Sequence, residues 1–510
     1  MGRSNKPRRA TLGLAILRSR AQIGTHAPPV TIEVFLSGGL PSFSIVGMPE
    51  TAVRESKDRV RSALISSEFR FPQERITVSL GPADMKKTGG RFDLAIALGI
   101  LAASNQLPPE SLRDTEFYGE LALDGELRRV PAILPAALKA KSAGRRMIVP
   151  RPNAADAALA RADVRPATSL TDVTAHLKGD EELPAVACER RHCNSRVEPD
   201  IADVRGQAHA KRALEIAAAG GHNLLLIGPP GTGKSMLARC LPGILPPMTE
   251  VEALETATID SVLGQPLDIS RWRQRPFRAP HHTASPAALV GGGPGPSPGE
   301  ISRAHNGVLF LDELPEFNRN VLEVLREPLE AGVITIARAG AQADFPAGFQ
   351  LVAAMNPCPC GYLGDPAADC SCSSDRVATY RGKVSGPLLD RIDLHVEVGR
   401  PAKEALRSDA PPAESSSDVA ARVVKARQVQ LDRCGRSNAL LEGKELRSWC
   451  ELSGKSLHLL ENALDRFNLS ARAYQRVQRV ARTIADLAGE ERIMPPHVAE
   501  ALSLRQLDRR

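Results

Sequence analysis

The chain has 510 residues, more than one hydrophobic core usually organises, so its length predicts about three domains. Its 42% hydrophobic and 25% charged residues are typical of a soluble globular protein, and the lack of any run of 18 apolar residues argues against a transmembrane helix. The net charge of +7 is compatible with a polyanionic partner. Because only 4% of residues are aromatic, contacts to a nucleic acid would depend on Arg and Lys more than on stacked rings.

The first residues, 1–10, are basic, and no acidic residue precedes Glu33. They lack the apolar stretch of a signal peptide, so we interpret them as a solvated basic tail, with an organellar transit peptide as the alternative. Nine unevenly clustered cysteines favour a reducing compartment. We therefore expect a cytoplasmic protein without a membrane anchor.

Residues 11–178 mix strand-like and helical patterns, which predicts an α/β domain. The expected elements are strands over 30–36 and 75–80, an amphipathic helix over 51–64, an apolar helix over 94–103 and a hairpin that turns at Asp124-Gly125.

Two segments of this domain resemble the Lon-protease-like α/β domain: Lys87-Thr-Gly-Gly-Arg-Phe-Asp93, and then Gly119-Glu-Leu-Ala-Leu-Asp-Gly125. In those proteases the first loop carries a serine nucleophile, and the resemblance places Arg91 at that position. Without a hydroxyl, a lysine has nothing to activate. We therefore predict a catalytically inactive domain that serves as a scaffold or a binding surface.

Residues 179–200 are polar and suit a linker, and the segment 201–400 that follows contains a phosphate-binding pattern. Residues 228–235 spell Gly-Pro-Pro-Gly-Thr-Gly-Lys-Ser, which matches G-x-x-x-x-G-K-[ST] in full. An apolar run over 223–227 predicts a buried strand before the loop, and helix-forming residues follow it. Backbone amides and a helix N-terminus then surround a phosphate. An ordinary glycine turn is the alternative.

This pattern predicts that the chain binds ATP with Mg²⁺. Lys234 would contact the β- and γ-phosphates, and the Ser235 hydroxyl would be a ligand of Mg²⁺. The predicted nucleotide-binding residues are Gly228, Pro229, Pro230, Gly231, Thr232, Gly233, Lys234, Ser235 and Met236.

Polar residues end two further predicted strands. The apolar run 307–311 ends at Asp312 and Glu313, and the run 350–355 ends at Asn356. Ligands of doubly wound sheets bind at the carboxyl ends of the strands, so these side chains would face the phosphates. Asp312 would complete the Mg²⁺ shell, Glu313 would orient or deprotonate the attacking water, and Asn356 would bond the γ-phosphate or its water. A solvated turn is the alternative for the two acids.

A Gly/Pro-rich insertion over 275–298 separates the phosphate loop from these acids, and we expect it to lack regular structure. Further along, Arg391 stands between acids in 385–393. It is either a structural ion-pair partner or a charge supplied to the γ-phosphate of a neighbouring subunit.

Four cysteines follow Asn356 closely. Cys358, Cys360, Cys370 and Cys372 form the pattern C-x-C-x₉-C-x-C, which matches Zn²⁺ in ligand number and softness. We predict a structural zinc site with no open position, with four free thiols as the alternative.

Residues 401–510 are predicted to be helical after a Pro/Ser-rich loop over 409–417. The segment 470–487 has an apolar stripe at helical spacing, and Arg472, Arg476 and Arg479 lie along another face. Such a basic face is most often solvent-exposed, although one of its members could reach a nucleotide.

The order of these motifs resembles the magnesium-chelatase-like AAA+ family called YifB or ComM, over essentially the whole chain. The resemblance implies a doubly wound P-loop AAA+ domain, a C-terminal helical lid, and a homo-hexameric ring with ATP at the subunit interfaces. It implies that Asn356 is sensor 1, that Arg391 is a trans-acting arginine finger and that Arg472 is sensor 2. It also places the insertion and a hairpin over 332–338 in the pore of the ring.

ComM relatives act as DNA helicases that drive branch migration in natural transformation and recombination. The resemblance therefore implies an ATP-driven motor on branched or single-stranded DNA, working beside recombination proteins, and Arg278 and Arg338 are our candidates for contacts to the DNA backbone. The alternative is a protein-remodelling ATPase, similar to the motor subunit of magnesium chelatase, that does not act on DNA.

Overall fold

The computed structural model describes residues 13–187, 199–293, 296–338, 341–401, 413–467 and 469–505, without the side chains of Arg338 and Ala341. The chain divides into two compact units. The first comprises Met1–His192 and Leu254–Trp272, and the second comprises Cys193–Ala253 and Arg273–Arg510. The predicted domain boundaries near 178, 200 and 400 remain predictions.

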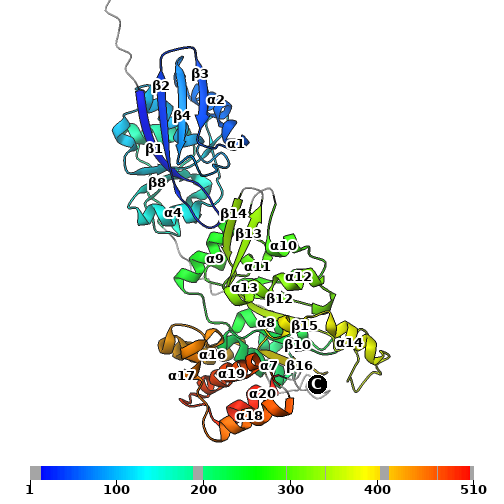
Figure 1. The fold of residues 1–510 in the computed structure, drawn as a ribbon. Coiled ribbons are helices and arrows are strands. Elements are labelled where there is room, and N and C mark those ends of the chain that lie inside the picture. Colours follow the sequence, from blue (N-terminus) through cyan, green and yellow to red (C-terminus); the bar gives the residue numbers. More distant parts are fainter. Residues whose placement is uncertain are drawn as a thin grey trace, which may run out of the picture. The chain divides into compact units, whose positions relative to one another are not determined.

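The first unit is built on a seven-stranded mixed sheet in the order β3-β4-β2-β1-β5-β8-β9 (Figure 1). The pairs β1–β2 and β2–β4 are antiparallel, and the other neighbours are parallel. Alternate residues of β2 are buried, as expected for a strand with one face on a core. The strands are β1 (Gly13–Arg20), β2 (Pro29–Ser37), β3 (Ser42–Val46), β4 (Arg75–Gly81), β5 (Thr115–Phe117), β8 (Arg146–Pro150) and β9 (Val164–Ala167).

The helices of this unit include α3, whose eleven residues are all buried and which packs against β1 and β2. The helix expected over 51–64 is divided at Glu55 into α1 and α2. The expected hairpin is present, since β6 (Glu120–Leu121) and β7 (Leu127–Arg128) pair antiparallel around Gly125. The helices are α1 (Thr51–Arg54), α2 (Ser56–Ser66), α3 (Asp93–Ala103), α4 (Ile133–Ser142), α5 (Ala154–Ala158) and α6 (Leu170–Lys178).

The segment Leu254–Trp272 belongs to the first unit although it lies beyond the phosphate loop in sequence. It includes most of α9 (Glu250–Val262). The Ser261 carbonyl accepts a hydrogen bond from the amide of Ala132 (2.7 Å), and the Ser261 hydroxyl accepts one from the amide of Leu134 (3.2 Å). Leu254 and Trp272 pack on the cluster that contains Leu134. The fold of the first unit therefore uses residues that the sequence analysis placed in the ATPase segment 201–400.

The second unit contains a five-stranded parallel sheet in the order β11-β12-β15-β10-β16. Every residue of β10, β12 and β15 is buried, which is typical of parallel strands covered on both faces. The parallel α/β core predicted for an AAA+ P-loop domain is therefore confirmed. The strands are β10 (Leu224–Ile227), β11 (Phe277–Arg278), β12 (Val308–Leu311), β15 (Gln350–Met355) and β16 (Leu394–Glu397).

The insertion before β12 is more regular than expected. It contains α10, where the Ser285 hydroxyl accepts a hydrogen bond from the amide of Ala288 (3.2 Å) and Pro286 occupies the first helical position. Both residues favour a helix start, so the prediction of no regular structure was wrong here. An antiparallel hairpin of β13 (Val333–Arg338) and β14 (Ala341–Pro346) follows. The helices of this part are α7 (Ala208–Gly220), α8 (Lys234–Ile244), α10 (Pro286–Val290), α11 (Glu300–Arg303), α12 (Arg319–Val324), α13 (Arg326–Ala331), α14 (Ser374–Gly382) and α15 (Gly386–Leu389).

The C-terminal region is helical, as predicted. Its apolar stripe in α19 (Val477, Val480, Ala481 and Ile484) is buried in the same core as residues of α7 and α8. The helices are α16 (Ser416–Cys434), α17 (Gly443–Trp449), α18 (Lys455–Phe467), α19 (Ala471–Ala488) and α20 (Pro495–Ser503). Within the described ranges, no helix has the length and apolar character that a membrane crossing requires.

Candidate nucleotide-binding site

The predicted phosphate loop connects the buried strand β10 to α8, which begins at Lys234. Gly231 and Gly233 have φ values of 76° and 89°, in the left-handed region that glycine adopts without strain. A side chain at Gly228 would meet the carbonyl oxygen of Val398 at 2.1 Å, so only glycine fits there. Thr232 is buried and its hydroxyl donates to the carbonyl of Pro229 (3.0 Å). The glycine positions of the pattern are thus required by the backbone itself.

The ammonium group of Lys234 lies under this loop. It donates to the carbonyls of Gly228 (2.6 Å) and Pro229 (2.8 Å) and to the side-chain oxygen of Asn356 (3.1 Å). Burial lowers the pKa of Lys234, and the carboxylates of Asp312 and Glu313 partly oppose that shift. The structure therefore brings together Lys234, the two carboxylates and the side-chain amide of Asn356, as the sequence predicted. These residues follow the ends of three separate strands, β10, β12 and β15.

Ser235 and Asp312 form the candidate Mg²⁺ site. The Ser235 hydroxyl donates to Oδ2 of Asp312 at 2.6 Å, and the other oxygen of Asp312 accepts from the amide of Glu313 at 2.9 Å. A hydroxyl and a carboxylate oxygen are hard ligands of the type that Mg²⁺ takes beside nucleotide phosphates. The donor set fits this ion, and Ser235 and Asp312 would be its two protein ligands.

Glu313 stands at the start of the turn after β12, with a φ of 54° that non-glycine residues rarely adopt. Its carboxylate lies 3.1 Å from Nδ1 of His282, in the insertion, and its side chain is 51% exposed. The centroid of the His282 ring lies 4.2 Å from that of His281, with the two rings tilted by 34°, and the His282 ring meets Phe317 edge-on. His282 was not predicted as a site residue, because nothing in its spacing within the insertion 275–298 places it beside Glu313.

Arg391 follows α15 and is 7% exposed. Its guanidinium forms an ion pair with Glu330 at the end of α13, and it also donates to the carbonyl of Pro387 (2.6 Å). Of the two interpretations of Arg391, the structural ion pair is present within this chain, and the trans-acting role remains a prediction. Glu330 was not predicted. It lies three residues before the hairpin strand β13, so a short connection links the partner of Arg391 to the hairpin.

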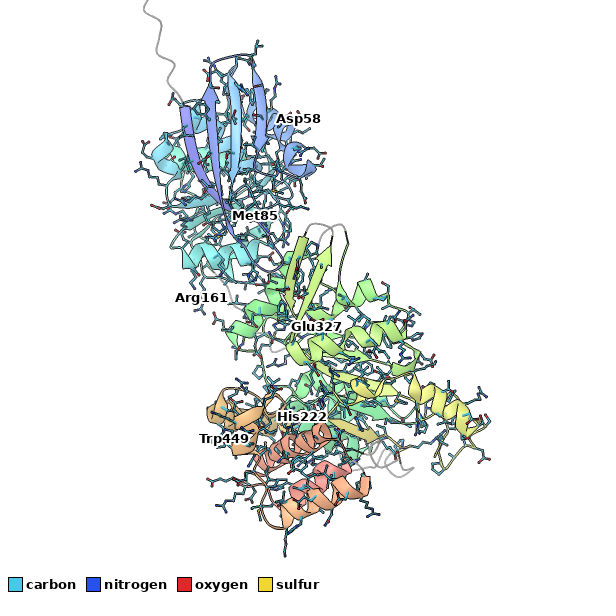
Figure 2. The ribbon with its side chains drawn as sticks, viewed as in Figure 1. Asp58, Met85, Arg161, His222, Glu327 and Trp449 are labelled. Atoms are coloured by element: carbon cyan, nitrogen blue, oxygen red, sulfur yellow. The ribbon has the colours of Figure 1, made fainter. Side chains whose placement is uncertain are left out.

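Arg472, predicted as sensor 2, is exposed in the first turn of α19, and its role remains a prediction. One turn further along, Arg476 forms an ion pair with the buried carboxylate of Asp393. Burial by itself would raise the pKa of Asp393, but Arg476 and His222 outweigh it and hold that pKa well below its usual range. His222, labelled in Figure 2, is fully buried and bonds Thr483 of α19 through Nε2 (2.8 Å). These contacts anchor α19 to the start of β16.

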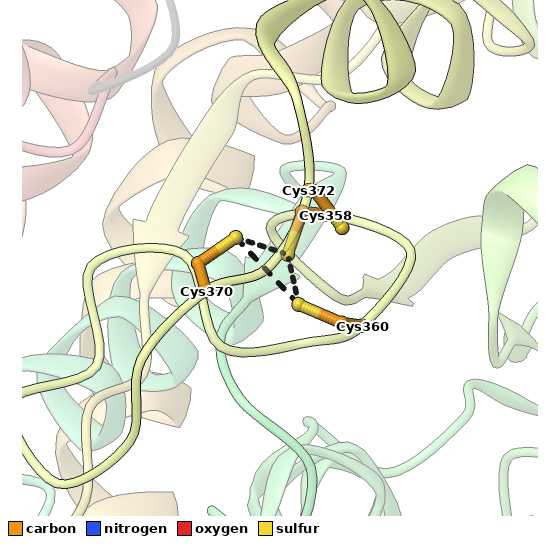
Figure 3. A group of neighbouring side chains, drawn as sticks. All are labelled: Cys358, Cys360, Cys370 and Cys372. Carbon is orange, nitrogen blue, oxygen red and sulfur yellow. Dashed lines mark hydrogen bonds between the residues drawn. The ribbon is translucent and has the colours of Figure 1, made fainter.

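The four cysteines form one cluster in the loop between β15 and α14, as Figure 3 shows. The Sγ atoms of Cys358 and Cys360 are 3.4 Å apart, and Cys370 lies 3.7 Å and 3.6 Å from these two. Cys372 completes a set in which all four sulfurs lie within 4.8 Å of one another. The structure thus brings together the predicted ligands in an arrangement that can hold a metal ion.

The two arginines proposed for DNA contact differ in what the structure describes of them. Arg278, a candidate for DNA contact, forms a two-bond ion pair with Glu300 (2.6 and 2.7 Å), which occupies its guanidinium. The side chain of Arg338 lies outside the described residues.

In the first unit, Arg91 is buried and donates to the carbonyl of Arg20 (3.2 Å), and its burial lowers its pKa to about 10. Lys87 is also fully buried, with its ammonium on the carbonyl of Pro82. The Lon-like relationship and the lack of catalysis remain predictions.

Comparison with known proteins places this site in a family. Three family profiles match the chain: magnesium chelatase, subunit ChlI, over residues 200–406; subunit ChlI of Mg-chelatase over 32–153; and the ChlI C-terminal region over 413–505. The competence protein ComM of Haemophilus influenzae is 51% identical over 504 residues, which are 98% of this chain and 98% of ComM. The chain belongs to the YifB/ComM family of magnesium-chelatase-like proteins.

Other relatives agree with this assignment. YifB of Escherichia coli is 47% identical over 98% of both chains. The magnesium-chelatase 38 kDa subunit of Cereibacter sphaeroides is 26% identical over 218 residues, which are 38% of this chain and 57% of that protein. Membership of this magnesium-chelatase-like AAA+ family implies ATPase activity, with ATP and Mg²⁺ as the expected cofactors.

Proposed function

We propose that this YifB/ComM-family protein is an ATP-hydrolysing motor that acts on branched or single-stranded DNA as a homo-hexameric ring in the cytoplasm. The observation that carries the ATPase part is the convergence of Lys234 with Asn356 (3.1 Å) and of Ser235 with Asp312 (2.6 Å) at the carboxyl ends of three parallel strands. This is where a doubly wound sheet binds its ligand.

Each group at this site has a chemical task in the proposed reaction. The loop amides and Lys234 bind the phosphates, and Ser235 and Asp312 bind Mg²⁺, which supplies charge neutralisation for the transferred phosphoryl group. Glu313 accepts a proton from the attacking water or orients it, and Asn356 bonds the water or the γ-phosphate. In the proposed ring, Arg391 leaves Glu330 and stabilises the transition state on a neighbouring subunit.

Two observations support DNA as the substrate. The similarity to competence protein ComM extends over 98% of both chains, whereas the chelatase subunit aligns with only 38% of this chain. The second unit also contains a two-stranded hairpin, β13–β14, of the kind that the family resemblance places in the pore of a ring.

Strand displacement on a forked or Holliday-junction DNA tests this proposal. At low salt, where phosphate contacts are strongest, the wild-type protein with ATP and Mg²⁺ should separate the strands. Glu313→Gln is the matched control, because it is nearly isosteric and should bind ATP and DNA without separating strands. Absence of strand separation by a wild-type protein that hydrolyses ATP would rule out the DNA motor.

Protein remodelling is the second candidate function, and the descriptions of the three matching profiles favour it, since all name magnesium chelatase. Ring ATPases share one motor chemistry across unrelated substrates. In that case ATP hydrolysis would proceed at the same rate with and without DNA, and a protein partner would stimulate it.

We further propose that the metal of the four-cysteine cluster is Zn²⁺. With Zn–S distances near 2.3 Å, a tetrahedral site separates its sulfurs by about 3.8 Å. The distances of 3.4, 3.6 and 3.7 Å among Cys358, Cys360 and Cys370 are close to this value. Four thiolates leave no open position, so the ion would have a structural role.

A further inference from the structure

The cysteine loop lies directly against the phosphate loop. Gly361, which follows the ligand Cys360, has a φ of 88°, and a β-carbon built on it would lie 2.8 Å from Cδ of Pro230. Pro230 is the third residue of the phosphate-binding pattern. The backbone of the cysteine loop thus approaches Pro230 as closely as a glycine allows.

The two loops are also joined at their bases. The amide of Gly228, where the phosphate loop begins, donates to the carbonyl of Met355 at the end of β15 (3.2 Å). The next residue, Asn356, bonds Lys234, and Cys358 follows two positions later with no exposed surface. The short stretch 356–361 therefore contains three relevant residues. The side chain of Asn356 contacts Lys234, Cys358 is buried, and Gly361 packs on the phosphate loop.

Residues 357–373 have no helix or strand that would hold Gly361 in place. The amide of Gly361 donates to the carbonyl of Cys358 (3.0 Å), which closes a tight turn between the first two cysteines. Cys370 and Cys372 come from the far end of the loop and meet this turn at the sulfur cluster. A metal ion there would cross-link both ends of the loop and fix the turn that carries Gly361.

We propose that a zinc ion bound by the four cysteines holds Gly361 against Pro230 and so sets the conformation of the phosphate loop, which makes ATP affinity depend on zinc. The inference rests on the proposed ATP binding and is independent of whether the substrate of the motor is DNA. Loss of the metal would release the turn, and the phosphate loop would lose the surface on which Pro230 lies.

The sharpest test separates the contact from the metal. Gly361→Ala adds a methyl group against Pro230 and alters no ligand. Gly364→Ala is the matched control, because Gly364 lies in the same loop with a similar φ of 79° and has nothing within 4 Å of the added carbon. Both variants should retain one zinc ion per chain by elemental analysis. Gly361→Ala should weaken binding of a fluorescent ATP analogue by roughly tenfold or more, while Gly364→Ala should bind like the wild type.

A second experiment removes the metal. Cys370→Ser, at a partly exposed ligand, should lose zinc and weaken ATP binding, with far-UV circular dichroism verifying that the protein stays folded. Three results would overturn the proposal: wild-type protein purified under reducing conditions without zinc, zinc loss with unchanged ATP affinity, or equal affinities of the two glycine variants. Zinc-loaded wild-type protein that binds no ATP would instead refute the proposed function, since metal content and ATP binding are measured on the same sample.

Discussion

Arg476 offers a direct test of how the C-terminal helices are attached to the five-stranded sheet of the second unit. Its side chain is 16% exposed and pairs with Asp393, which is 4% exposed. Asp393 also accepts a hydrogen bond from the amide of Asn223 (2.9 Å), and its other neighbour is the buried ring of His222 (3.7 Å). Arg476→Met would keep an unbranched apolar stem, remove the guanidinium and leave a buried carboxylate without its main counter-charge.

The cost of that change follows from the burial of both partners. Removing one member of a buried ion pair costs about 3–5 kcal/mol, because the remaining charge stays desolvated. For a unit of this size, such a loss lowers the melting temperature by on the order of 10 °C. The control is Arg472→Met, the same substitution one turn earlier at an exposed position, which should leave the melting temperature within about 1 °C.

The dependence on pH sharpens the prediction. The pKa of Asp393 is depressed in the folded protein, so the pair contributes stability above the unfolded value of about 3.9, and that contribution is lost as the pH falls toward the lower folded pKa. In Arg476→Met, burial would raise this pKa, and acid destabilisation should begin at a higher pH. Thermal unfolding of both variants between pH 4 and 7 measures the effect. Equal melting temperatures for Arg476→Met and Arg472→Met would show that the Arg476–Asp393 ion pair does not stabilise the fold.

Three further changes test the catalytic assignments. Glu313→Gln should retain ATP affinity and lose turnover by about 10²–10⁴-fold, because the amide accepts no proton; full turnover measured by phosphate release would remove Glu313 from this role. His282→Ala should raise basal turnover several-fold at unchanged ATP affinity, because Glu313 is freed from its partner at 3.1 Å; an unchanged or lower rate would show that the contact does not restrain Glu313. Arg391→Ala should lower turnover by about 10³-fold, and mixing it with Glu313→Gln, whose subunits still carry Arg391, should restore part of the activity; no restoration in such mixed rings would contradict the trans-acting role.

The parts of the site that the sequence predicts are those encoded locally. Residues 228–235 carry their own glycines, and the strand that ends at Asp312 is an uninterrupted apolar run. Ligands of a parallel sheet bind at the carboxyl ends of its strands, and this rule was sufficient to predict that Lys234 and Asp312 lie at the same edge of the sheet. The four cysteines were predictable for the same reason, since they lie within one short loop.

The contacts that were not predicted join residues far apart in the chain. Glu330 meets Arg391 across 61 positions, and Asp393 meets Arg476 across 83. Each pair depends on how helices pack on the sheet, which residue patterns do not specify. The same limit applies to Leu254–Trp272, whose helical pattern gives no sign that it completes the first unit.

The rate of ATP hydrolysis with and without forked DNA tests whether this protein is a DNA motor. We expect slow turnover by wild-type protein alone, a several-fold increase with saturating forked DNA at low salt, and loss of that increase as the salt concentration rises. Glu313→Gln should show the same loss of turnover, by about 10²–10⁴-fold, under both conditions. A wild-type rate that is the same with and without DNA, in protein shown to bind ATP, would contradict the claim that this motor acts on DNA.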